Sequence, residues 1–164
     1  MKRTYFLLLA FMLAMTVVKA QNNQAAIQMN DKMALVTDSL YSGGQRWGNE
    51  FNKCFTSGNY STLKPLCDQL LIYIDTKKVE VEKMKDVNNS KPLRMALIEL
   101  LVFEKRMIAE GFRPFEVFDA STSKEKVQAA LDNLKEKSKD EDVYVQKVAT
   151  AQKTYAGENG FKIE

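Results

Sequence analysis

Residues 92–118, PLRMALIELLVFEKRMIAEGFRPFEVF, form the most continuously apolar stretch of the chain after its N-terminal leader. Alternating steps of three and four residues place one set of these side chains on a single helix face, namely Leu97, Leu101, Glu104, Ile108, Gly111, Phe115 and Phe118. A helix face that is mostly apolar has to be covered by other helices. The stretch therefore predicts an all-α protein organised around this helix.

Three other segments show the same helical spacing and supply the partners. They are residues 22–57, the segment from Ser61 to the turn-like sequence 87–92, and the segment from Thr122 to the glycines at positions 157 and 160. Connections of only a few residues make successive helices antiparallel neighbours. We therefore expect a single domain with the topology of an up-down-up-down four-helix bundle of long antiparallel helices.

The ends of these helices carry their own signals. Gly58 is suited to end the first helix in a left-handed conformation, and Ser61 is the expected N-cap of the second. Thr122 and Glu125 match a capping box, in which the threonine side chain accepts from the backbone and the glutamate reaches back. The last helix is therefore predicted to start at Thr122.

Three places interrupt the helical pattern. Gly43 and Gly44 lie within the first helix, but the apolar spacing continues through them, which favours one helix, straight or bent, over a break. Pro114 favours a kink in a third helix that continues to about residue 119. The charged segment 135–142 favours a solvated face of a continuous fourth helix, and the alternative is a break at Ser138.

The glycine pair predicts a site of close helix packing, because glycine lacks the Cβ that holds a neighbouring helix away. Counting along an up-down-up-down bundle places Gly44 and Phe115 at the same height on two diagonal helices. Phe115, or Phe112 beside it, is then expected to fill the space next to the glycines. A Gly44→Leu substitution should accordingly destabilise the fold by about 1–3 kcal/mol.

Residues 1–20 have the pattern of a secretory signal peptide. Lys2 and Arg3 precede a short apolar run, which ends in a region with small residues up to Ala20. We expect cleavage after Ala20, export to the periplasm or the extracellular space with or without association with the cell surface, and a mature domain of residues 21–164 without a transmembrane segment. The apolar run is short for a membrane span, so a retained anchor is the less favoured alternative.

The distribution of charge gives no sign of a nucleic-acid partner. The formal net charge of +3 comes from Lys2, Arg3 and Lys19 in the leader, so residues 21–164 carry equal numbers of basic and acidic side chains. A neutral chain has no long-range field that attracts a polyanion. We therefore expect no nucleic-acid partner. A protein partner of unknown identity is compatible with this charge.

The composition also argues against catalysis. The chain contains no histidine, which removes the commonest general base and the usual transition-metal ligand. Glu104, with Glu99 and Glu116 nearby in sequence, is the main candidate for a carboxylate site, although a lone core glutamate is more often paired or solvated. Met29 and Met33 have the spacing of a Cu(I) site but are more typical of an apolar core. We therefore predict no enzyme, and no catalytic, cofactor-binding or metal-binding residue.

Cys54 and Cys67 lie on either side of the turn between the first two helices. An exported protein can form disulfides, but the offset of these residues along the helix axes makes a Cα separation below about 7 Å difficult. Two buried free thiols are therefore favoured over a disulfide.

Three segments carry a resemblance to a known family. The sequences GNYSTLKPLCDQL at 58–70, GFRPFEVF at 111–118 and AQKTYAGENGF at 151–161 resemble those of small exported bacterial helical-bundle proteins, which are called surface proteins and whose function is uncharacterised. The resemblance implies export and a helical fold, and it carries over no functional residue. Some members have a lipid-anchoring Cys after the leader, where this chain has Gln21.

Two functions are compatible with an exported helical bundle that has no recognisable group of catalytic side chains. The first is a non-enzymatic protein-interaction or surface and envelope protein, which presents a helical surface to a partner. The alternative is a carrier of a small apolar ligand or metal in the bundle interior, with walls formed by Trp47, Phe112, Phe115 and Phe118.

Overall fold

The computed structural model describes the backbone of residues 2–163 and the side chains of residues 23–163. The helices in chain order are α1 (Lys2–Ser57), α2 (Leu63–Lys83), α3 (Lys91–Met107), the π-helical turn η1 (Ile108–Phe112), the 3₁₀ turn η2 (Arg113–Val117), α4 (Lys124–Ser138) and α5 (Glu141–Glu158). No β-strand occurs within residues 2–163. The all-α prediction is confirmed.

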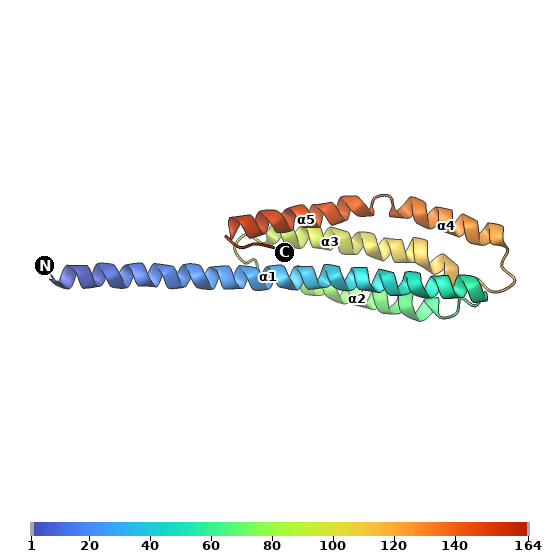
Figure 1. The fold of residues 1–164 in the computed structure, drawn as a ribbon, viewed down its shortest axis with the longest axis horizontal. Coiled ribbons are helices and arrows are strands. Elements are labelled where there is room, and N and C mark those ends of the chain that lie inside the picture. Colours follow the sequence, from blue (N-terminus) through green and yellow to red (C-terminus); the bar gives the residue numbers. More distant parts are fainter. Residues whose placement is uncertain (1, 164) are drawn as a thin grey trace.

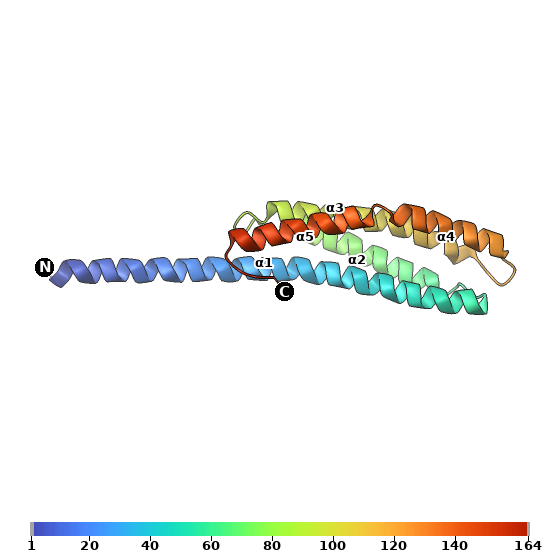
Figure 2. The ribbon, with the colours of Figure 1, turned by 45° about the horizontal axis from the view of Figure 1, so that its top comes forward.

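The helices lie along a common long axis, with α1 extending beyond the others at its N-terminal end (Figures 1 and 2). Helix α1 packs against α2, α2 against α3 and α3 against α5, while α5 also contacts α1. The core between them is built from buried apolar residues of all these helices, and α3 contributes most of its inner face to it. The segment around which we expected the fold to be organised therefore does lie at its centre.

Helix α1 is continuous through its glycine pair, as the spacing predicted. The expected partner of the pair, however, is wrong. A Cβ at Gly44 would meet no atom within 4 Å, whereas a Cβ at Gly43 would lie 2.3 Å from Cδ2 of Leu70 in α2. Phe115 of η2 packs instead against a later part of α1, where its ring centroid lies 4.8 Å from that of Phe51. Neighbouring helix positions point about 100° apart, so the inward-pointing glycine was misassigned by one residue.

The helical conformation continues past the glycine and proline of the third helix, but as two irregular turns instead of one kink. The π-helical turn η1 precedes Pro114, and the 3₁₀ turn η2 contains it and ends before the extended Phe118. Proline cannot donate to the carbonyl four residues earlier. That carbonyl, of Glu110, instead accepts from Nδ2 of Asn133 in α4, at 3.0 Å.

The prediction of one continuous fourth helix is wrong. Helix α4 ends at Ser138, whose hydroxyl donates to the carbonyl of Lys135 at 3.0 Å, and α5 begins at Glu141. The break therefore falls at the position of the less favoured alternative, and Asp140, the residue before α5, makes no side-chain capping hydrogen bond. The charged segment gives the helix no apolar face with which to hold α3, so the chain can bend there.

Two predicted N-caps are displaced by one residue. Ser123, and not Thr122, caps α4 by accepting from the backbone amide of Lys126 at 3.3 Å, because Thr122 itself accepts from the amide of Asp119. Helix α2 begins after Thr62 instead of Ser61. The left-handed stop at Gly58 is confirmed by its φ of +74°.

Both cysteines are buried and free, as predicted. The Sγ atom of Cys54 lies 3.3 Å from the hydroxyl of Thr62. Burial raises the pKa of the Cys67 thiol to about 12, and the neighbouring Glu116 adds to the rise. Both side chains therefore act as small members of the core.

The predicted leader and its cleavage site fall outside the residues whose side chains are described. In the described part of the chain, no helix is both long enough and apolar enough to cross a bilayer.

Candidate binding pocket

A cavity of about 540 Å³ lies between α1, α2, α3, α4 and α5. Its inner walls are apolar and come mainly from α2, α3 and η1, with Leu70, Ile74, Leu100, Met107, Ile108 and Phe112. Pockets for small molecules have volumes of about 300–1,000 Å³ and mostly apolar walls with a few polar groups. The cavity therefore has the size and the lining of a small-molecule site.

Two backbone features of the chain leave this space empty. Gly44 lies on the cavity wall without a side chain, and no atom occupies the position of its missing Cβ. The break between α4 and α5 falls on the opposite wall, which is formed by Ser138 and Glu141 at the two helix ends. A Leu at the glycine position would fill part of the space, so the glycine keeps the cavity open.

The mouth of the cavity lies between α1 and the start of α5. Tyr41, 69% exposed, and Val145, 37% exposed, belong to its lining. Asp38 and Gln45 on α1 are also exposed to solvent. A ligand can therefore reach the apolar interior without opening the core.

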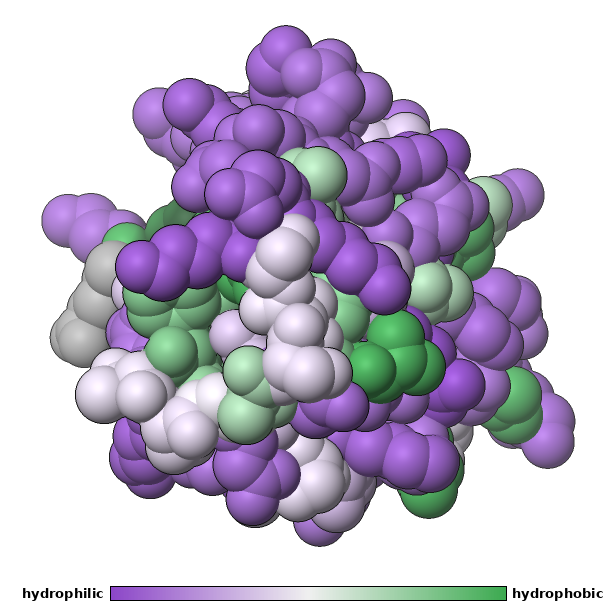
Figure 3. Space-filling view, turned by 90° about the vertical axis from the view of Figure 1, so that its right-hand side faces the viewer, coloured by the Kyte–Doolittle hydropathy of each residue, from purple (hydrophilic) through white to green (hydrophobic). Residues whose placement is uncertain are grey.

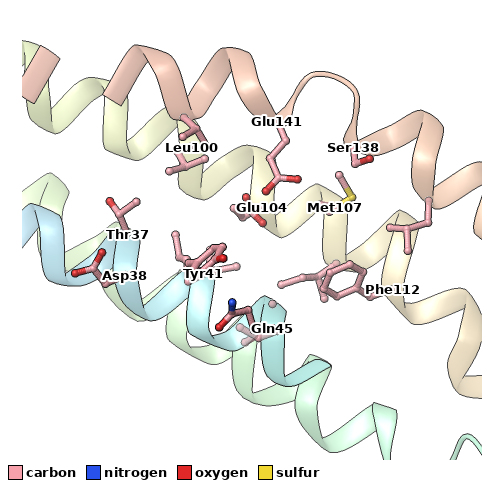
Figure 4. Close-up of a pocket in the computed structure, with 17 residues that line it drawn as sticks. Thr37, Asp38, Tyr41, Gln45, Leu100, Glu104, Met107, Phe112, Ser138 and Glu141 are labelled. Carbon is pink, nitrogen blue, oxygen red and sulfur yellow. The ribbon is translucent and has the colours of Figure 1, made fainter. Parts of the chain in front are cut away.

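Two carboxyl groups point into the same part of the cavity, Glu104 from α3 and Glu141 from α5 (Figure 4). Burial raises the pKa of the Glu104 carboxyl to about 7, and the negative charge of Glu141 adds to the rise. Burial also raises the pKa of Glu141, with Asp142 as a further cause. Within the described residues, neither carboxylate has an ion pair, so both are poorly compensated near neutral pH.

The sequence found only one of these two carboxyls. The two glutamates near Glu104 in sequence lie elsewhere: Glu99 forms an ion pair with Lys147 of α5, and Glu116 lies near Arg113 and Cys67. The true neighbour, Glu141, was assigned to a solvated stretch of a continuous helix. A signal was present, because Ser138 and Glu141 occupy stripe positions in an otherwise apolar pattern, as Glu104 does on the third helix.

Of the four aromatic residues expected as ligand walls, only Phe112 lines the cavity. Its ring stacks on Trp47, with centroids 3.9 Å apart, and Trp47 lies 5.8 Å edge-on from Phe115. Phe118 packs on Phe115 at 5.5 Å. These residues form a continuous aromatic cluster that closes one end of the cavity, with Phe112 at its surface.

The structure offers little for a metal ion. Among the described residues, no group of three or more Cys, Asp or Glu side chains is arranged to hold one. Met29 and Met33 are both buried members of the hydrophobic core. The mostly apolar walls of the cavity are typical of a site for an organic ligand.

Comparison with protein-family models, with curated proteins and with solved structures gives no match for this chain.

Proposed function

We propose that this protein is an exported, non-catalytic carrier, an up-down-up-down four-helix bundle that binds a small, largely apolar ligand in its interior cavity. The observation that carries the proposal is the cavity of about 540 Å³ with apolar walls, a glycine in place of a wall side chain and a mouth at the surface. A cavity of this size with mostly apolar walls lies within the range typical of small-molecule sites.

Export is part of the proposal and is supported by the leader pattern of residues 1–20. A carrier outside the cytoplasm would exchange its ligand with the surrounding solution. The partly exposed residues at the mouth, such as Tyr41, are compatible with such exchange.

The other function expected from the sequence, docking of a partner protein on an exposed helical surface, has weaker support and stays a prediction. Viewed from the end where α1 meets α2, the surface shows hydrophobic areas that are small and interrupted by hydrophilic side chains (Figure 3). Phe55 and Val117 are exposed, 56% and 78%, but isolated apolar side chains are normal on a soluble protein.

The proposal is tested by filling the cavity. The full mature chain is titrated with N-phenyl-1-naphthylamine, a neutral apolar dye that fluoresces on leaving water, and bound dye is displaced with alcohols of increasing chain length. Gly44→Leu should place four carbons in the cavity and weaken dye binding by about tenfold or more, since a filled pocket loses most of its ligand contacts.

Gly48→Leu is the matched control. Gly48 lies about one turn farther along the same helix, its Cβ position is equally free, and it does not line the cavity. Dye binding to this variant should equal that of the wild type. Absence of saturable binding to the wild type, or an equal loss in both variants, would show that the cavity is not a ligand site.

A further inference from the structure

We infer that the cavity selects apolar ligands that carry a protonated amine. The inference depends on the carrier function proposed above and names the chemical class of its ligand. It is based on the sign of the charges in the cavity wall, where Asp38, Glu104 and Glu141 are acidic and no Lys or Arg is present.

This one-sided charge is local. The chain beyond the leader is formally neutral, so an acidic cavity wall is not a consequence of an acidic protein. The nearby bases are already paired on the outside of the helices, Lys105 with Asp75, Lys137 with Glu110 and Lys147 with Glu99. These three bases are therefore engaged outside the cavity.

The depth of the two glutamates indicates how such a ligand would lie. Glu104 is largely buried against the apolar walls, whereas Glu141, at the first turn of α5, is only partly buried and is the more exposed of the two. A buried carboxylate without a partner is costly, and an ammonium group held between the two would remove that cost while donating up to three hydrogen bonds. The apolar part of the ligand would then occupy the space between Ile74 and Phe112.

Ligands of other charge are disfavoured by the same wall. A fatty acid would bring a third negative charge next to Glu104 and Glu141, and a neutral alcohol would leave the carboxylates uncompensated. The protein therefore distinguishes among apolar molecules by the charge of one terminal group.

Binding of an amine should depend on pH. The titratable groups that face Glu104 across the cavity are Glu141 on α5 and Asp38 and Tyr41 on α1, while α2 and α4 contribute no titratable side chain to the lining. The pKa of the Glu104 carboxyl is about 7, so raising the pH from 5.5 to 8 ionises it while an alkylamine stays protonated. Amine affinity should rise over this range, and alcohol affinity should not.

The test compares three eight-carbon compounds, octylamine, octanol and octanoate, as competitors of the bound naphthylamine dye at pH 8. Octylamine should bind about tenfold or more tightly than octanol, the size of one charge-assisted hydrogen bond, and octanoate should bind more weakly than octanol. Glu104→Gln should remove most of the difference between amine and alcohol. Glu141→Gln should reduce it and serves as a second variant.

Glu99→Gln is the control, because it removes a carboxylate from the same helix that lies outside the cavity and pairs with Lys147. It should keep the full preference for the amine. Equal binding of octylamine and octanol, or unchanged preference in Glu104→Gln and Glu141→Gln, overturns the inference but leaves the carrier function standing. Failure of all three compounds and of the dye to bind overturns the carrier function itself, and with it the inference.

Discussion

Substituting each of the two adjacent glycines of α1 by alanine tests which of them is held against a neighbouring helix. An ideal Cβ at Gly43 would lie 2.3 Å from Cδ2 of Leu70, far inside the 3.5–4.0 Å at which carbon atoms make favourable contact. At Gly44 the same Cβ would meet no atom within 4 Å. The two substitutions are chemically identical and differ in sequence position by one residue.

The expected magnitude follows from two opposing terms. Alanine is favoured over glycine inside a helix by about 1 kcal/mol, so Gly44→Ala should raise the free energy of unfolding by up to that amount. Gly43→Ala gains the same term but has to displace Leu70, and overpacking a core costs about 1–3 kcal/mol. Leu70 also borders the cavity, into which its side chain can turn, so the lower part of that range applies. Gly43→Ala should therefore be less stable than Gly44→Ala by about 1–2 kcal/mol.

The assay is equilibrium unfolding in urea, followed by circular dichroism, for both variants and for each combined with Leu70→Ala. Removing the leucine side chain removes the obstacle, so Gly43→Ala should then gain stability relative to its background, and Gly44→Ala should show little coupling. Equal effects of the two substitutions, or no coupling between Gly43→Ala and Leu70→Ala, would refute the assignment of Gly43 as the close-packed glycine.

Three further predictions concern stability and processing. In the folded state the pKa of the Glu104 carboxyl is about 7, above its ordinary value of 4.5. The folded state therefore keeps this proton at higher pH than the unfolded state does. The stabilisation that results is lost as the pH rises from 4.5 to about 7. The free energy of unfolding of Glu104→Gln minus that of the wild type should therefore increase by about 1–3 kcal/mol between pH 4.5 and pH 8. Urea titrations at the two pH values measure this difference, and the same value at both would contradict the prediction. Tyr155→Phe removes a 2.9 Å hydrogen bond from the hydroxyl to the carbonyl of Val87 and should lower the free energy of unfolding by about 0.5–1.5 kcal/mol, whereas Tyr41→Phe, at an exposed position, should change it little. Intact-mass measurement of the protein recovered from its own host should find Gln21 as the first residue, and a full-length chain in the membrane fraction would contradict the predicted cleavage.

Several local features of this protein could be predicted from the sequence alone. The helical class, the continuity of α1 through Gly43 and Gly44, and the stop at Gly58 were predicted correctly, because each depends on residues within a few turns of one another. The spacing of apolar residues also predicted that helical turns continue around Pro114. It did not predict the π-helical and 3₁₀ turns that accommodate the proline.

The contacts between different helices could not be predicted from the sequence. Pairing across helices depends on the rotation and the relative height of each helix, and an error of one residue turns a side chain by about 100°. For this reason Leu70 lies against Gly43 and not Phe115 against Gly44, and Glu104 meets Glu141 instead of Glu99. The cavity has the same origin, because it forms where a glycine of α1 lies opposite the break between α4 and α5, two positions that are nearly a hundred residues apart in the chain.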